Sequence, residues 1–219
     1  MITAISGLAK VANATSAESL ASSYGKWAGI RSNHVISADG NFAGIDGSSR
    51  SISTREDREL LVALRSRVDL IVVDAATARL EKYQTPSSGA ALAIFSLSGR
   101  FDEIPAVEKP SGRVFLFSKT LSDRFSGRSD LAHVAIGDEP FNGFLDWAKD
   151  QNFESVLLEA GPTLTRYAFT ASIVGQSAIT RTPLSAAKDP EASTNPFDSS
   201  ALLVSFAVSE DASFSLWTH

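Results

Sequence analysis

The feature that most constrains this chain is the stretch from Ser155 to Leu164, Ser-Val-Leu-Leu-Glu-Ala-Gly-Pro-Thr-Leu. Its short apolar run is typical of a strand that is buried on both faces. Glu159 stands where that strand would end, Gly161 permits a tight turn, and Pro162 suits the first position of a helix. The stretch therefore predicts a strand, a turn and a helix N-terminus that can hold a phosphate. A corner of this kind is also common as a plain connection in α/β proteins.

Strands and helices are predicted to alternate along most of the chain. The expected strands are 29–37, 68–73, 90–95, 114–117, 131–136, 155–158 and 173–181, and the expected helices are 16–24, 54–67, 75–82, 120–125, 141–148 and one that starts at Pro162. Residues 101–111 and 182–200 are expected to be irregular, and the alternating residues of 202–208 and 214–216 predict an antiparallel hairpin. This order predicts an α/β domain over 16–219, after an N-terminal arm over 1–15, with a mostly parallel central sheet and a C-terminal hairpin.

Composition narrows the classes of protein that remain. The 219 residues fit one large domain better than two small ones. The absence of cysteine excludes disulfides and thiolate chemistry, and the three histidines are too far apart in sequence for a metal-ligand spacing. A net charge of −5 argues against a nucleic-acid surface, and no apolar run reaches the roughly 18 residues of a membrane span. Because the N-terminus lacks a secretory pattern, we expect a cytoplasmic protein.

Polar residues follow four of the predicted strands, at the ends where open α/β sheets bind ligands. They are Asp39, the run from Asp74 to Thr77, the trio of Ser96, Ser98 and Arg100, and Glu159. The trio suits a phosphate monoester, although a solvated loop is the alternative. Asp39 or Glu159 could transfer a proton, although each could instead be a turn residue or a partner of a helix dipole. The sequence contains no glycine-rich dinucleotide motif, Walker motif, nucleophile elbow or metal signature.

Several of these motifs occur in one fixed order. They are Asn33-x-x-x-Ser37-x-Asp39-Gly40, a helix that starts near Thr54, Ala75-x-Thr77 after a strand, Ser96-x-Ser98-Gly99-Arg100, and the run from Val156 to Leu164. In this order the motifs resemble the C-terminal reductase domain of the bifunctional riboflavin-biosynthesis deaminase/reductase. The chain is most similar to the stand-alone actinobacterial-type pyrimidine reductases of that family, over residues 16–218.

The resemblance implies a dihydrofolate-reductase-like fold, NADPH as hydride donor, a homodimer, and reduction of the ribosyl group of a phosphoribosylamino-pyrimidine. It implies cofactor contacts from Ala75, Thr77, Ala160, Gly161, Thr163 and Leu164, with Ser96, Ser98 and Arg100 at the adenosine 2′-phosphate. It implies that Asn33, Ser37, Asp39, Ser53 and Glu159 line the substrate and nicotinamide end. Asp39 is then the best candidate for proton delivery, with Glu159 as the second candidate catalytic group. The protein would supply positioning and electrostatics, because the nicotinamide carries the hydride chemistry.

The chain departs from the family pattern at four positions. Asp74-Ala-Ala76-Thr replaces Gly-Ala-Gly-Thr, Ala160 replaces a glycine, and Asn41 replaces a basic residue. A Cβ at Ala76 or Ala160 could obstruct a close ligand, and Asp74 adds negative charge near an anionic cofactor. Three hypotheses therefore stay open: a pyrimidine reductase, a dihydrofolate- or pteridine-type reductase on the same fold, and a non-catalytic relative that binds without turnover.

Overall fold

The computed structural model describes residues 3–5, 16–185 and 200–219. The strands are β1 (Thr3–Ile5), β2 (Gly29–Ile36), β3 (Leu70–Asp74), β4 (Ala91–Phe95), β5 (Val114–Ser118), β6 (Ala132–Ala135), β7 (Ser155–Leu158), β8 (Val174–Arg181), β9 (Leu202–Val208) and β10 (Ser213–Thr218). The helices are α1 (Ala17–Ser23), α2 (Arg55–Arg65), α3 (Ala75–Leu80), α4 (Pro105–Glu108), α5 (Phe144–Asp150) and α6 (Pro162–Thr170), with a 3-10 turn at η1 (Ser49–Ser51). Within these described ranges, none of the helices combines the length and the apolar character that a membrane crossing requires.

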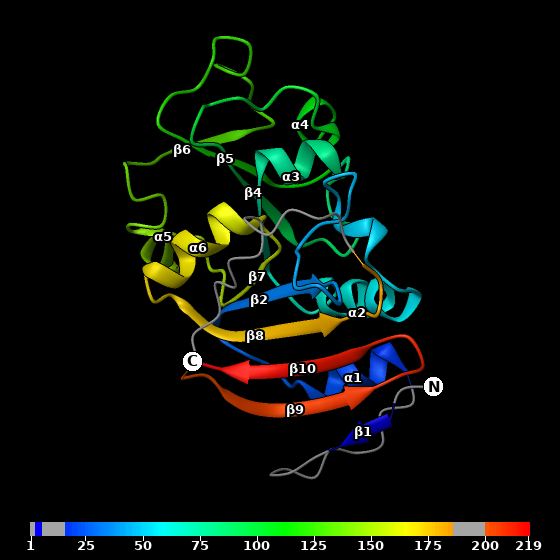
Figure 1. The fold of residues 1–219 in the computed structure, drawn as a ribbon. Coiled ribbons are helices and arrows are strands. Elements are labelled where there is room, and N and C mark those ends of the chain that lie inside the picture. Colours follow the sequence, from blue (N-terminus) through cyan, green and yellow to red (C-terminus); the bar gives the residue numbers. More distant parts are fainter. Residues whose placement is uncertain (1–2, 6–15, 186–199) are drawn as a thin grey trace.

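One sheet, parallel in its centre and antiparallel at one end, organises the molecule (Figure 1). Its strand order is β1-β9-β10-β8-β2-β7-β3-β4-β5-β6, and every pair from β8 to β6 is parallel. The hairpin of β9 and β10 pairs with β8 in antiparallel fashion, and β1 adds to β9. The predicted mostly parallel sheet with a C-terminal antiparallel hairpin is confirmed.

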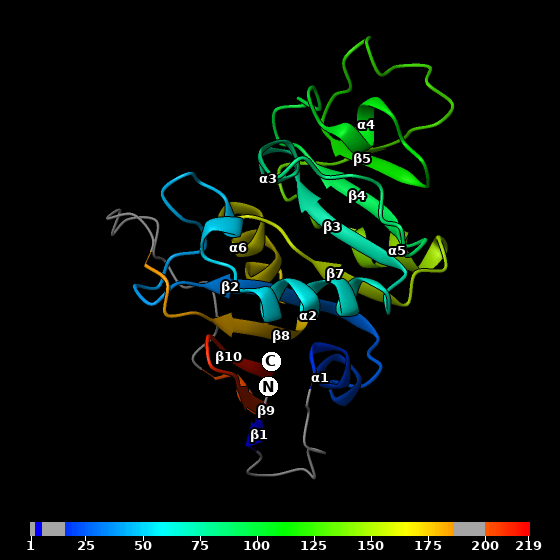
Figure 2. The same ribbon diagram turned by 90° about the vertical axis from the view of Figure 1, so that its right-hand side faces the viewer.

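Alternate side chains of the central strands pack into separate cores on the two faces of the sheet. Leu70 and Val72 of β3 pack with α5 and α6, whereas Ile71 and Val73 pack on the side of α3 and α4. Leu157 of β7 packs with α1 and α2. Figure 2 shows α2 and α6 on opposite faces of the sheet. The fold therefore has three layers, with helices on both sides of the sheet.

Side-chain caps explain where the first two helices begin. Ser16 accepts the Ser19 N–H, and the Ser19 hydroxyl accepts the Ser16 N–H, so Ser19 closes a capping box. Thr54 caps α2 by accepting the N–H of Asp57 at 3.3 Å. The helices predicted over 16–24 and 54–67 are present as α1 and α2, and α2 ends two residues before the predicted end.

Some short segments differ from the sequence prediction. The helix predicted over 120–125 is wrong: the chain forms turns there, which bury Phe125. The short helix α4 lies within 101–111, which we expected to be irregular, and Pro105 occupies its first turn. Residues Thr3–Ile5 of the predicted arm form β1, and the rest of that arm lies outside the described residues. Most of the loop predicted for 182–200 also lies outside them.

The parallel strands bring the candidate residues together. Strands β2, β7, β3 and β4 are consecutive in the sheet and run in one direction. Their C-terminal ends therefore meet at one edge, which we call the carboxyl edge. All four groups of polar residues that follow predicted strands belong to this edge, which is where α/β sheets bind ligands.

Candidate functional site

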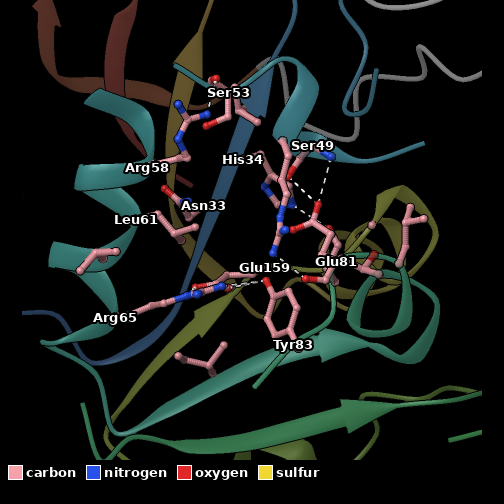
Figure 3. Close-up of a pocket in the computed structure, with 18 of the residues that line it drawn as sticks. Asn33, His34, Ser49, Ser53, Arg58, Leu61, Arg65, Glu81, Tyr83 and Glu159 are labelled. Atoms are coloured by element: carbon pink, nitrogen blue, oxygen red, sulfur yellow. Dashed lines mark hydrogen bonds and ion pairs between the residues drawn. The ribbon is translucent and has the colours of Figure 1, made fainter. Parts of the chain in front are cut away.

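A cavity of about 840 Å³ opens at the carboxyl edge, with α2, residues from the ends of β2 and β7, and the segment after α3 in its wall (Figure 3). This volume lies within the range of sites that hold small molecules and cofactors. The charged side chains of the wall are the basic Arg50, Arg58, Arg65 and Lys82 and the acidic Asp57, Glu81 and Glu159. A wall of mixed charge suits a ligand that carries both phosphate and neutral polar groups.

Glu159 is held in this wall by two partners. It directly follows β7, and its side chain is only 4% exposed. Arg65 binds both carboxylate oxygens, with Nε 2.9 Å from Oε1 and Nη2 2.5 Å from Oε2, and the Tyr83 hydroxyl donates to Oε2 at 2.7 Å. Burial and the charge of Glu159 raise the pKa of Tyr83, so its hydroxyl stays protonated and remains a donor. Arg65 and Tyr83 therefore fix the orientation of the carboxylate, as Figure 3 shows.

His34 connects β2 to the start of α6. Its Nε2 lies 3.0 Å from the carbonyl oxygen of Ala160 and 3.1 Å from the hydroxyl of Thr165. Because a carbonyl oxygen can only accept, Nε2 carries the proton in the bond to Ala160. Burial lowers the pKa of His34 to about 4, and the Ala160 carbonyl and the Glu159 charge oppose this shift only in part. The imidazole is therefore neutral at pH 7.

Asp57 is a buried carboxyl in the same wall that the sequence did not single out. The Ser53 hydroxyl donates to Asp57 Oδ2 at 2.6 Å. Burial raises the pKa of Asp57, although hydrogen bonds from Ser53 and Thr180 act in the opposite direction. Its helical spacing could have indicated burial, because Asp57 shares the buried face of α2 with Leu60 and Leu64. A charged residue is rare on such a face unless it is paired or functional.

Arg65 and Tyr83 were also missed from the sequence. Arg65 lies one helical turn after Leu61, and both residues line the cavity. An arginine in line with an apolar position of a helix is a weak signal that it reaches a buried partner. Tyr83 follows α3, and no local pattern marks it, because its contact with Glu159 spans 76 residues of sequence.

Asp74 bridges two turns at the carboxyl edge. As the N-cap of α3 it accepts the Thr77 N–H at 2.8 Å through Oδ1. Its other oxygen, Oδ2, accepts the Thr77 hydroxyl at 2.8 Å and the Gly161 N–H at 2.6 Å. Gly161 is the N-cap of α6 and has no side chain that could cap this helix. Asp74 therefore supplies an acceptor at the positive end of α6.

The structure places part of the predicted site at the cavity and the rest outside its wall. The predicted residues that line the cavity are Asn33, Ser53, Thr77, Glu159, Ala160 and Gly161. The predicted residues outside its lining are Ser37, Asp39, Ala75, Ser96, Ser98, Arg100, Thr163 and Leu164. Of the two alanines that replace family glycines, Ala160 is buried and lines the cavity, whereas Ala76 is exposed on α3 and does not.

Asp39, the predicted proton donor, lies on an exposed turn beyond β2. The Ser37 hydroxyl donates to its Oδ1 at 2.5 Å and the Ser185 hydroxyl to its Oδ2 at 3.1 Å. The predicted phosphate loop also bonds to itself, because the Ser96 hydroxyl accepts the Arg100 N–H at 3.0 Å. The roles assigned to Asp39 and to this loop stay predictions.

The described residues contain no group of three or more histidine, aspartate and glutamate side chains that could hold a metal ion. The other two histidines are hydrogen bonded elsewhere, His133 to Ser118 at 3.0 Å and His219 to Ser177 at 2.7 Å. The wall of the cavity offers a ligand hydrogen bonds, charge and apolar contact.

Comparison with known proteins identifies one family profile and several similar structures. The profile of the RibD C-terminal domain matches residues 28–186. A pyrimidine reductase-like protein from Corynebacterium diphtheriae has a TM-score of 0.72 at 21% identity, over 93% of this chain and 98% of that one. The diaminohydroxyphosphoribosylaminopyrimidine deaminase/5-amino-6-(5-phosphoribosylamino)uracil reductase of Thermotoga maritima has a TM-score of 0.70 at 15% identity, over 92% of this chain and 59% of that one.

A dihydrofolate reductase from Enterococcus faecalis, solved with NADP(H), has a TM-score of 0.53 at 9% identity, over 86% of this chain and 95% of that one. At these identities the likenesses show the fold alone, and the predicted dihydrofolate-reductase-like fold is confirmed. No curated protein matches the sequence.

Proposed function

This chain belongs to the RibD C-terminal domain family, and we propose that it is an NADPH-dependent reductase of a pyrimidine substrate in riboflavin biosynthesis. The substrate class is that of 5-amino-6-(5-phosphoribosylamino)uracil, whose ribosyl group would be reduced to ribityl. The Thermotoga maritima neighbour is, by its name, a reductase of that uracil, and the Corynebacterium diphtheriae neighbour is pyrimidine reductase-like.

The cavity at the carboxyl edge is the observation that carries this proposal. Its volume of about 840 Å³ suits a small-molecule site, and it lies where α/β sheets bind ligands. Its basic side chains suit phosphate groups, which both the substrate and the cofactor carry. Glu159 adds a buried carboxylate whose orientation is set by Arg65 and Tyr83. The volume and the donor set of the cavity thus fit the reacting ends of a nicotinamide and a phosphorylated pyrimidine.

The residues that the family resemblance implies have distinct roles in this proposal, both in the cavity wall and outside it. NADPH would supply the hydride when bound. Ala160, Gly161, Thr163 and Leu164 would hold its pyrophosphate, and Ala75 and Thr77 would lie beside the cofactor. Ser96, Ser98 and Arg100 would bind the 2′-phosphate. Asn33, Ser37 and Ser53 would orient the substrate through hydrogen bonds. Glu159 would face the nicotinamide end.

A protonated group is needed near the reacting atoms, and two carboxyl groups are candidates besides Glu159, which is paired with Arg65. Asp39 is the candidate that the family resemblance suggests. Asp57 is a second candidate, because it lies in the cavity wall and burial raises its pKa. Replacing each by asparagine distinguishes the two candidates, because only the substitution of the true proton donor should alter the pH profile of turnover.

Two alternatives share the fold. A dihydrofolate- or pteridine-type reductase has support from the likeness to the Enterococcus faecalis enzyme, which concerns the fold alone. A non-catalytic relative with a weakened cofactor site has support from Asp74, whose carboxylate accepts the Gly161 N–H at the helix start proposed for the pyrophosphate.

NADPH binding to the purified protein tests the proposal, with nicotinamide fluorescence and calorimetry as the readouts. We expect saturable binding, followed by oxidation of NADPH with the phosphoribosylamino-pyrimidine. Absence of binding at millimolar cofactor contradicts the reductase proposal. Oxidation with dihydrofolate but not with the pyrimidine supports the first alternative, and binding without turnover of either supports the second.

Arg100→Ala tests the position of the adenosine end. We expect it to weaken NADPH at least about tenfold more than NADH, because only NADPH carries the 2′-phosphate. Arg113→Ala is the matched control, since Arg113 is an exposed arginine that lies over the rings of Phe115 and Phe153. An equal loss for the two cofactors refutes the 2′-phosphate assignment.

A further inference from the structure

Two strand-to-helix turns lie side by side in the wall of the cavity. Strands β3 and β7 are parallel neighbours, so the turn from β3 into α3 and the turn from β7 into α6 both open at the carboxyl edge. Thr77 and Gly161, one from each turn, line the cavity. Asp74 bonds to both of them and therefore joins the two turns.

The close approach of the Asp74 carboxylate to the start of α6 depends on Gly161, which has no side chain. A Cβ at this position would lie 3.0 Å from Thr77 Oγ1 and 3.2 Å from Asp74 Oδ2. The φ angle of Gly161 is −64°, which any residue adopts, so the glycine serves the approach of the carboxylate and not an unusual backbone angle. Gly161 has a backbone N–H, whereas the next residue, Pro162, has none. Asp74 thus takes a donor that an anionic ligand would otherwise use.

We propose that Asp74 is an internal anion that determines which ligands the cavity accepts. Its carboxylate joins the starts of α3 and α6 and repels a phosphate at this point. A dinucleotide pyrophosphate that reaches Gly161 must displace the carboxylate, whereas a ligand that is uncharged at this point need not. The inference rests on the proposed function, because it takes NADPH as the anionic ligand. It makes Asp74 a residue that sets specificity, not one that takes part in the chemistry.

Asp69 provides a matched control at the opposite end of β3. Its Oδ2 accepts the N–H groups of Glu154 and Ser155 at 3.0 and 2.9 Å, so it also joins β3 to the chain segment of β7. Asp69 is exposed and does not line the cavity. Its replacement by asparagine neutralises a comparable bridge without changing the charge near the cavity.

NADPH binding to Asp74→Gly, Asp74→Asn and Asp69→Asn tests the inference. Glycine is tolerated at an N-cap and asparagine caps as well as aspartate, so both Asp74 variants should keep α3, which circular dichroism and thermal melting verify. We expect Asp74→Gly to bind NADPH at least about tenfold more tightly than the unchanged protein, which is about 1.4 kcal/mol. Asp74→Asn should gain less, because its amide oxygen still accepts from Gly161, and Asp69→Asn should gain nothing.

Reduced nicotinamide riboside, which has no phosphate, separates charge from shape. We expect it to bind the unchanged protein and Asp74→Gly equally. If the unchanged protein binds NADPH and Asp74→Gly binds it no more tightly, the inference is wrong. It is also wrong if the riboside gains as much as NADPH, because the effect would then be steric.

Inorganic pyrophosphate tests the junction without the cofactor, with the Gly161 amide followed by NMR. We expect pyrophosphate to shift this resonance in Asp74→Gly and to leave it in place in the protein without the substitution. If no variant binds NADPH but this response is seen, the reductase proposal fails and the inference stands. No shift in Asp74→Gly, or an equal shift in both proteins, overturns the inference.

Discussion

The two ends of the β3–β7 pair use the same chemistry in different surroundings. Asp69 at the amino end and Asp74 at the carboxyl end each accept backbone N–H groups from the chain segment of β7. Asp69 is exposed on a surface turn, where it holds two strands together. Asp74 is half-buried, bonds to two residues of the cavity wall and stands at the N-terminus of α6. The same bridge is therefore structural at one end and lies where a ligand would bind at the other.

The difference extends to the charges around the two aspartates. The carboxyl edge carries the buried Glu159 with Arg65, and the neutral His34 beneath the start of α6. The carboxylate of Asp69 is exposed to solvent, so water and dissolved ions can replace its interactions at little cost. The same kind of substitution should therefore change stability or ligand binding strongly at the carboxyl edge and weakly at the amino end.

The largest expected effect is that of Arg65→Ala. It leaves the carboxylate of Glu159, whose side chain is 4% exposed, without its cation. Removal of one partner from a buried ion pair costs about 3–5 kcal/mol. Because the Arg65 side chain is itself 30% exposed, we expect a loss toward the lower end of this range in the free energy of unfolding. Urea denaturation measures it.

Arg67→Ala is the matched control for this prediction. Arg67 pairs with Glu18, whose side chain is 65% exposed, so the loss should stay below about 1 kcal/mol. Equal losses for the two variants would show that the Glu159 pair is no more protected from water than a surface pair.

The second effect is a pH dependence at His34. Its pKa is about 4 in the folded protein against 6.5 for a free imidazole. Because the folded value is the lower one, the unfolded chain takes up the proton first, and stability is lost as the pH falls from 6.5 toward 4. The shift corresponds to about 3 kcal/mol between pH 7 and pH 4.

His34→Gln tests this effect, since glutamine can still donate to the Ala160 carbonyl but does not titrate. The variant should lose about 3 kcal/mol less than the unchanged protein between pH 7 and pH 4, in urea titrations at both values. His133→Gln, at an exposed histidine on β6, is the matched control for the substitution itself. If His34→Gln loses as much stability as the unchanged protein, His34 is not held neutral by burial.

Local residues predicted much of the fold. Gly161 and Pro162 indicated the turn and the helix start after β7, and Thr54 the start of α2, because caps and turns depend on a few neighbouring residues. The strand order could not be obtained in this way. Strand β7 lies between β2 and β3, and only this arrangement brings Glu159 to Arg65, 94 residues earlier in the chain.

The candidate site was predictable in its position and not in its contacts. The resemblance assigned Asn33, Thr77, Glu159 and Gly161 to the substrate or cofactor, and all four line the cavity, whereas Asp39 does not. The loop at Ser96 follows β4, which β3 separates from β7, and this loop is outside the cavity wall. The extra charge of Asp74 was visible in the sequence, but its bond to Gly161 spans 87 residues and required the pairing of β3 with β7.

The smallest expected effect returns to the amino end of β3. Burial tends to raise the pKa of Asp69, but the hydrogen bonds from Ser155 and Glu154 outweigh it, so the folded value lies below 3.8. The stabilisation is therefore present above pH 3.8 and is lost as the pH falls through the folded value. Asp69→Asn should lower the free energy of unfolding at pH 7 by about 1 kcal/mol or less, because the group is exposed, and this deficit should shrink as the pH falls below 3.8. Urea titrations at pH 7 and below pH 3.8 measure it. A larger effect of Asp69→Asn than of Asp74→Asn on NADPH binding would remove the distinction between the two ends of the strand pair.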